Sequence, residues 1–179
     1  PDSRFPRKVK RRWVPDLDQF PTQSTLFTPD TEFREMALVE MNRGCPRGCR
    51  FCAACFVYHP FRNRSLSVLE SISKEALLKE HRVGLTGTAV SDHPQLLPLC
   101  QSILSQRGEI SLSSLRVDAV RPSLIQCLRE GEERTVAIAP EAGTERLRRI
   151  SKKGYPEEEI LKSIETLVEN GIFQIKCYF

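Results

Sequence analysis

The strongest constraint on the fold is an alternation of strand and helix patterns that begins at Met36. Short apolar runs predict strands at residues 36–40, 82–86, 109–112, 135–139 and 173–178. Helical spacing of apolar residues predicts helices between them, at residues 68–81, 95–107, 123–130 and 156–170. A strand followed by a helix, repeated along the chain, is typical of a parallel sheet covered by helices. We therefore expect an α/β fold built from βα units.

The first 35 residues lack this alternation. They hold five prolines and few periodic apolar positions, so residues 1–35 are expected to form an extended lead-in or interdomain linker. Trp13, Phe20 and Phe27 are expected to hold this lead-in to the body. Residues 36–179 have the length of one ordinary domain. Because the chain lacks an initial methionine and ends on a strand pattern without a helix, we expect a segment cut in or after the fifth strand.

A basic run is the other feature of the lead-in, and it consists of Arg4, Arg7, Lys8, Lys10, Arg11 and Arg12. It supplies much of the formal net charge of +4. Contact with nucleic acid or with an acidic partner is one interpretation of such a run. A solvated linker is the other, since terminal charges usually stay hydrated.

Export and membrane signals are not found in the sequence. No apolar run approaches the length of a membrane span, so we expect no membrane association. Seven cysteines form an odd set with motif-like spacing, which favours reduced thiols over a disulfide framework. We therefore expect a cytoplasmic protein.

Three cysteines, Cys45, Cys49 and Cys52, follow the first predicted strand with the spacing C-x3-C-x2-C. Glycines and a proline lie among them, so the thiols are expected on a loop that leaves the strand. Closely spaced thiolates suit an iron–sulfur cluster, and glycines let the backbone approach its sulfurs. Three ligands leave one iron of a [4Fe-4S] cluster open to a small molecule, so the cluster could take part in a reaction.

With Phe51 directly before the last cysteine, the motif resembles the signature of the radical S-adenosylmethionine (SAM) superfamily. The sequence from Glu40 to Ala54 is similar to that of the branch whose members often carry a cobalamin-binding domain upstream. The resemblance implies a partial, TIM-like (β/α)6 barrel and a catalytic domain at residues 36–179. It also implies an oxidoreductase-type reaction, in which SAM is cleaved reductively to a 5′-deoxyadenosyl radical that abstracts hydrogen from a substrate.

The same resemblance implies partners and leaves the substrate open. An external one-electron reductant, flavodoxin-like or ferredoxin-like, would reduce the cluster. Cobalamin would be held by an upstream domain outside this chain. Methyl transfer and sulfur-group transfer both occur among relatives.

Ligands bind at the carboxyl ends of the strands in parallel α/β folds, and there the chain resembles the SAM site of the family. Gly87 and Thr88 take the place of the glycine-rich motif that holds the methionyl amino group. Arg116 can grip the methionyl carboxylate in a bidentate manner. Glu141 resembles the polar residue that contacts SAM after the fourth strand.

Two further assignments rest on the resemblance, and each has a simpler alternative. Phe51 is expected beside the adenine, but it could only pack. Lys152 lies near where relatives carry a basic residue facing the carboxylate. A plain glycine turn would also explain Gly87, and pairing with Asp118 would also explain Arg116.

Two other function classes stay open at this point. Cys55 forms a second C-x2-C with Cys52, so four thiolates, with His59 nearby, could bind zinc in a nucleic-acid-interaction module. A simple iron–sulfur electron carrier would need the cluster but no cavity at the strand ends.

Overall fold

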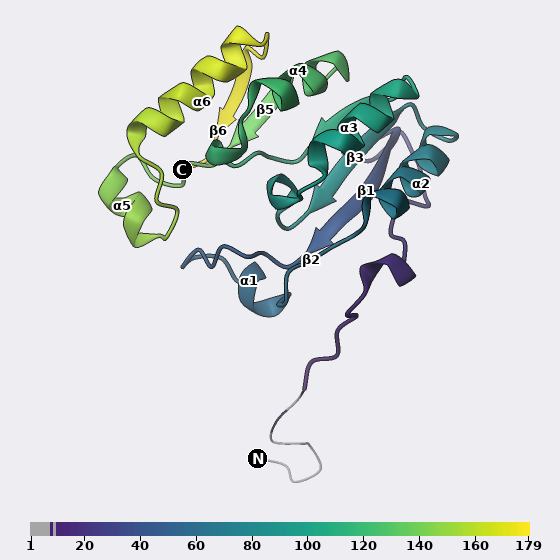
Figure 1. The fold of residues 1–179 in the computed structure, drawn as a ribbon, viewed down its shortest axis with the longest axis horizontal. Coiled ribbons are helices and arrows are strands. Elements are labelled where there is room, and N and C mark those ends of the chain that lie inside the picture. The colour runs from purple at the N-terminus through teal and green to yellow at the C-terminus, as the bar shows by residue number, and fades with distance from the viewer. Residues whose placement is uncertain (1–7, 9) are drawn as a thin grey trace.

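The computed structural model describes residues 8 and 10–179, and its larger sheet confirms the parallel arrangement. The sheet order is β2-β1-β3-β4 (Figure 1). The parallel neighbours in it are β1 (Met36–Arg43), β3 (Arg82–Gly87) and β4 (Glu109–Leu112). The short β2 (Arg62–Asn63) pairs antiparallel with the end of β1.

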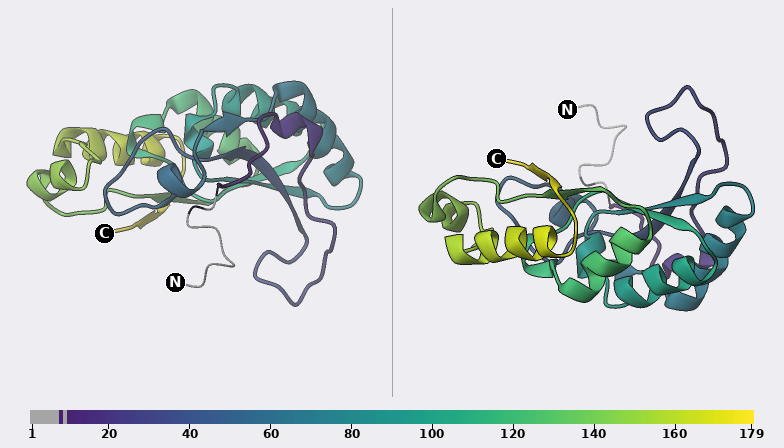
Figure 2. Two further views of the ribbon diagram at one scale, coloured as in Figure 1. Left: turned by 90° about the horizontal axis from the view of Figure 1, so that it is seen from below. Right: turned by 90° about the horizontal axis from the view of Figure 1, so that it is seen from above.

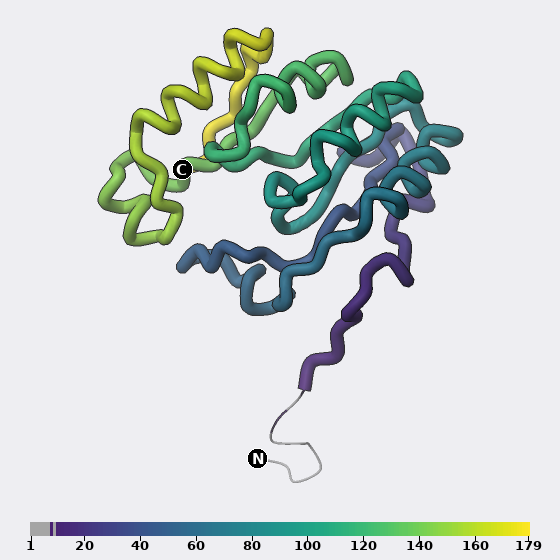
Figure 3. Tube along the Cα trace, in the orientation of Figure 1, coloured from purple at the N-terminus to yellow at the C-terminus, as the bar shows by residue number. Residues whose placement is uncertain are grey.

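A smaller sheet continues the fold with β5 (Thr135–Ile138) and β6 (Gln174–Cys177), which are also parallel. Leu115 and Ile138 form a parallel bridge between the two sheets. The strands therefore follow an open arc, as the trace in Figure 3 shows, and the described residues form no closed barrel. The predicted α/β fold with an incomplete parallel barrel is confirmed.

Helices cover one face of both sheets (Figure 2). These helices are α2 (Leu66–Leu77), α3 (Leu96–Ser105), α4 (Pro122–Glu130) and α6 (Glu157–Glu169). The core lies between the layers, where strand residues such as Val39 and Leu85 are fully buried with Leu99 and Ile125 of the helices. Local sequence sets the helix starts, because Ser65 caps α2 through its hydroxyl and Pro122 occupies the first turn of α4. None of the described helices is long and apolar enough to cross a membrane.

Several short elements were not predicted. They are α1 (Ala54–Val57), α5 (Glu145–Ile150) and β2, with the 3-10 turns η1 (Leu17–Gln19), η2 (Val90–Asp92) and η3 (Val117–Ala119). The first strand also runs beyond its predicted end, to Arg43, because Asn42 and Arg43 pair with β2. Elements this short carry too few residues for a periodic apolar pattern.

The end of the lead-in is bound to the larger sheet. Leu17 is buried, and residues 22–24 hydrogen-bond along β1, with Ser24 N donating to Leu38 O at 2.9 Å. This pairing covers the outer edge of β1. Phe27 packs against the core as expected, whereas Phe20 is 57% exposed, contrary to expectation. Arg4 and Arg7 of the basic run lie outside the described residues.

Candidate functional site

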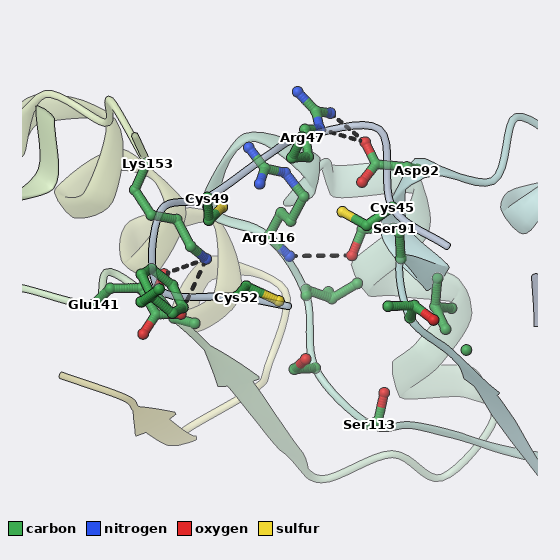
Figure 4. Close-up of a pocket in the computed structure, with 18 residues that line it drawn as sticks. Cys45, Arg47, Cys49, Cys52, Ser91, Asp92, Ser113, Arg116, Glu141 and Lys153 are labelled. Atoms are coloured by element: carbon green, nitrogen blue, oxygen red, sulfur yellow. Dashed lines mark hydrogen bonds and ion pairs between the residues drawn. The ribbon is translucent and has the colours of Figure 1, made fainter. Parts of the chain in front are cut away.

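A cavity of about 190 Å³ opens at the carboxyl ends of β1, β3, β4 and β5. We call it the cysteine cavity. The loop after β1 contributes Cys45, Arg47, Cys49, Phe51 and Cys52. The other loops contribute residues 87–92 after β3, 113–116 after β4, and Ala139, Glu141 and Lys153 after β5. Figure 4 shows the three cysteines, Arg116 and Glu141 around the same space.

Glycine geometry shapes the cysteine loop. Gly44 has a φ of +82°, and a Cβ there would lie 2.6 Å from the carbonyl oxygen of Tyr58, so no other residue fits without a shift. Arg50 fixes the far side of the loop, since its backbone N donates to Ser151 O at 3.0 Å and its Nη1 donates to Ile150 O at 2.9 Å. The loop is thereby joined to the end of α5, on the other side of the cavity.

The donor set of the loop fits an iron–sulfur cluster. Cys45, Cys49 and Cys52 are free thiols that line one cavity. A cluster takes one thiolate per iron and spreads its ligands, whereas a zinc ion needs its ligands around one point. No three His, Cys, Asp or Glu side chains among the described residues are grouped around one point in that way. Cys55 does not line the cavity, and its Sγ lies 3.7 Å from Cys52 O.

Burial affects the protonation of one of these thiols. It raises the pKa of Cys45, with the negative charges of Asp92 and the neighbouring cysteines adding to the shift. Metal binding requires the thiolate, so loading the site must displace this proton.

Asn42 shapes the turn after β3 and was not predicted as a site residue. Its side chain is buried, its Nδ2 donates to Ala89 O at 2.8 Å, and its Oδ1 accepts from Ala89 N at 3.1 Å. A Cβ on Gly87 would lie 2.6 Å from that Oδ1. The amide of Asn42 therefore requires glycine at position 87 and holds the backbone of Ala89, which lines the cavity.

Arg116 pairs with Asp118, which is the simpler of its two predicted roles. Its Nε and Nη2 donate to the two carboxylate oxygens of Asp118, each at 2.9 Å. Arg47 lies 3.8 Å from the same carboxylate and donates its Nε to Asp92 Oδ1 at 2.8 Å. Burial alone would raise the pKa of Asp118, but the Arg116 hydrogen bonds lower it below its usual range. Because Nη1 of Arg116 has no acceptor among the described residues, one donor group remains for a ligand.

Tyr155 supports Arg116 from beneath. The guanidinium carbon of Arg116 lies 5.2 Å from the centre of the Tyr155 ring, a cation–π distance. Tyr155 is only 3% exposed, and this burial raises the pKa of its phenol. Arg116 is therefore held by the carboxylate of Asp118 and by the ring of Tyr155.

Lys153, and not Lys152, reaches the cavity. Its Nζ lies 3.2 Å from Glu141 Oε1 and donates to Ala139 O at 3.2 Å. Lys152 follows the end of α5 with a φ of +65°, in a left-handed turn directly before Lys153. Glu141 itself has a φ of +69°, and its backbone N donates to Tyr178 O at 3.0 Å, which joins the cavity wall to the end of β6.

Residues 39–179 match the sequence profile of the radical SAM superfamily. The chain belongs to this superfamily. It is also 36% identical over 179 residues to an uncharacterised protein of Methanocaldococcus jannaschii, a match that covers 96% of this chain and 39% of that protein. The chain thus spans about two fifths of the length of this curated relative.

Several solved structures share the fold, and two of them, OxsB and TsrM, are radical SAM enzymes. The cobalamin-dependent enzyme OxsB has a TM-score of 0.65 at 16% identity, over 78% of this chain and 23% of that one. The methyltransferase TsrM from Kitasatospora setae has a TM-score of 0.61 at 14% identity, over 78% and 30%. Methylornithine synthase (PylB) has a TM-score of 0.54 at 16% identity, over 79% and 43%. At sequence identities this low, the similarity shows that the fold is shared and nothing more.

The cavity brings together every residue predicted from the radical SAM resemblance except Lys152. The predicted residues that line it are Cys45, Cys49, Phe51, Cys52, Gly87, Thr88, Arg116 and Glu141. Sequence reasoning missed Asn42, Arg47, Asp92 and Lys153. Asn42 offered one signal, since it is a polar residue at the end of a buried apolar strand.

Proposed function

We propose that Cys45, Cys49 and Cys52 hold a [4Fe-4S] cluster and that the rest of the cysteine cavity binds SAM. The observation that carries this proposal is the convergence of three thiols, a partly unpaired arginine and a glutamate on one cavity at the strand ends. When bound, the reduced cluster supplies the electron that cleaves SAM to methionine and a 5′-deoxyadenosyl radical, which takes hydrogen from the substrate.

The residues of the chain bind and orient SAM in this proposal. Arg116 offers its Nη1 to the methionyl carboxylate, while Asp118 and Tyr155 keep its guanidinium in place. The turn at Gly87 and Thr88 offers backbone groups to the methionyl ammonium. Glu141 can accept hydrogen bonds from a ribose diol or an ammonium group, with Lys153 as its fixed neighbour.

We propose a cytoplasmic setting, since reducing conditions keep the cluster thiols free. An external flavodoxin-like or ferredoxin-like protein would deliver the electron. Methyl transfer is the proposed reaction subclass, because TsrM is described as a methyltransferase and shares the fold. Cobalamin would be supplied by a domain outside this chain, as the OxsB and TsrM structures contain it.

Formation of 5′-deoxyadenosine tests the proposal. The chain is reconstituted anaerobically with iron and sulfide, reduced with dithionite and mixed with SAM, and the nucleoside is measured by mass spectrometry. We expect the wild type and Cys55→Ala to release 5′-deoxyadenosine and Cys49→Ala to release none, because Cys49 lines the cavity and Cys55 does not. A chain with a fully loaded cluster that forms no nucleoside would favour an iron–sulfur electron carrier instead.

A further inference from the structure

A second cavity of about 760 Å³ adjoins the cysteine cavity and shares Gly87 and Thr88 with it. We call it the arginine cavity. Its wall is formed by the end of the lead-in, the ends of β1 and β3, and the segment around β2. Its charged lining residues are Arg11, Arg12, Arg43, Arg62 and Glu40. Four arginines therefore face one glutamate in a space next to the proposed SAM site.

Glu40 does not neutralise this charge. Its carboxylate lies 2.7 Å from Arg43 Nε and 2.7 Å from Arg64 Nη2, and Arg64 is a further arginine behind the cavity wall. Of the described residues that line the cavity, no other is acidic. The lining thus has an excess of positive charge that its own residues leave uncompensated.

Arg62 shows how these charges are held without a counterion. It donates to the backbone carbonyls of Val14, Tyr58 and Pro60, which satisfy its hydrogen bonds but supply no negative charge. Burial lowers the pKa of Arg62, and the cations Arg11 and Arg43 lower it further. The arginines repel each other, so an anion entering the cavity would gain from all of them.

Other donors in the cavity remain available to an anion. Arg43 uses its Nε for Glu40 and leaves its side chain 40% exposed, and neither of its Nη atoms has an acceptor among the described residues. Trp13 and Tyr58 add aromatic faces, and the guanidinium carbon of Arg62 lies 5.3 Å from the centre of the Trp13 ring. Such a wall suits an organic molecule that carries a charged group.

We propose that the arginine cavity binds the carboxylate or phosphate group of a small-molecule substrate and holds that substrate beside the proposed SAM site. That the bound molecule is a substrate rests on the proposed function, whereas the anion site does not. Arg11 and Arg12 of the basic run then serve this site, and are neither a solvated linker nor a nucleic-acid contact.

Trp13 provides a direct test, because it is the single tryptophan of the chain and lies in the cavity wall. The chain is titrated with inorganic phosphate and with citrate at constant ionic strength, and the Trp13 fluorescence is followed. We expect a saturable change with at least one of these anions and none with chloride. The anion that saturates at the lower concentration identifies the preferred group.

Charge variants locate the site. Arg43→Gln is expected to weaken anion binding at least tenfold, and Arg12→Gln, on an exposed residue, is a second variant that should also weaken it without disturbing the fold. Arg107→Gln removes the same charge from an exposed position outside the cavity lining and should bind as the wild type does.

Three results would overturn the proposal. They are an equal response to chloride, unchanged affinity in both Arg43→Gln and Arg12→Gln, and a response to single-stranded polynucleotide but to neither small anion. The titration needs no cluster and no SAM. A failure of cluster assembly would therefore leave this test intact, and the two proposals can fail separately.

Discussion

Arg64 and Arg116 both pair with a carboxylate, but they differ in how many of their donors the chain uses. The side chain of Arg64 is 0% exposed and donates to Glu40 O, to the carbonyls of Leu17 and Phe20, to Thr22 Oγ1 and to the Glu40 carboxylate. The side chain of Arg116 is 16% exposed, lines the cysteine cavity and, among the residues that the structure describes, donates only to Asp118.

The difference separates a structural arginine, Arg64, from Arg116, which we propose binds SAM. All three nitrogens of the Arg64 guanidinium have acceptors, so Arg64 joins the lead-in to β1 and has nothing left for a ligand. Arg116 is held by two bonds and keeps Nη1 for the cavity. Unused donors beside a cavity are therefore a better sign of function here than an ion pair as such.

The largest expected effect is on stability, in Arg64→Met. This change removes the Arg64 partner of the partly buried Glu40 carboxylate. It also leaves the carbonyls of Leu17 and Phe20 without their hydrogen-bond donor. Breaking a buried pair from one side costs about 3–5 kcal/mol of unfolding free energy. Urea unfolding followed by circular dichroism measures this loss.

Arg43→Met is the matched control, because Arg43 pairs with the same carboxylate from a 40% exposed position. Its expected cost is at most about 1 kcal/mol. Equal losses in the two variants would remove the distinction drawn for Arg64.

The next effect is on SAM binding, in Arg116→Met. A hydrogen bond to a charged group contributes about 1.5–3 kcal/mol, so we expect SAM to bind roughly 10 to 100 times more weakly to the reconstituted chain. The stability loss should be smaller than in Arg64→Met, since Arg47 remains 3.8 Å from Asp118. Calorimetric titration and urea unfolding measure the two quantities. Unchanged SAM affinity with a large stability loss would make Arg116 a second structural arginine.

The smallest effect is the pH dependence of stability in Asp118→Asn. The folded-state pKa of Asp118 is depressed, so its stabilisation is present above about pH 4, the unfolded value, and is lost as the pH falls through the folded value. The wild type should therefore lose unfolding free energy faster than Asp118→Asn as the pH falls below about 4. At pH 7 the variant should be less stable by at most about 1 kcal/mol. Parallel pH profiles would contradict the Arg116–Asp118 pairing.

The sequence predicted the features of the fold and the site that depend on local residue patterns. The strands and longer helices follow from apolar spacing, and the cysteine loop follows from its motif. Asn42 and Arg64 could not be found in this way, because their partners Ala89 and Leu17 are each 47 positions away. Sequence reasoning chose Lys152, but Lys153 lines the cavity. Which of two adjacent lysines does so depends on the backbone conformation, here with a left-handed φ at Lys152, which the sequence pattern does not reveal.

Anaerobic reconstitution with counting of iron and sulfide tests the central claim most directly. We expect about four iron and four sulfide ions per chain in the wild type and in Cys55→Ala. We expect loss of the bound iron in Cys45→Ala, Cys49→Ala and Cys52→Ala. Zinc bound without iron or sulfide, or a loss in Cys55→Ala as large as in the other three variants, would contradict a cluster held by the thiols of the cysteine cavity.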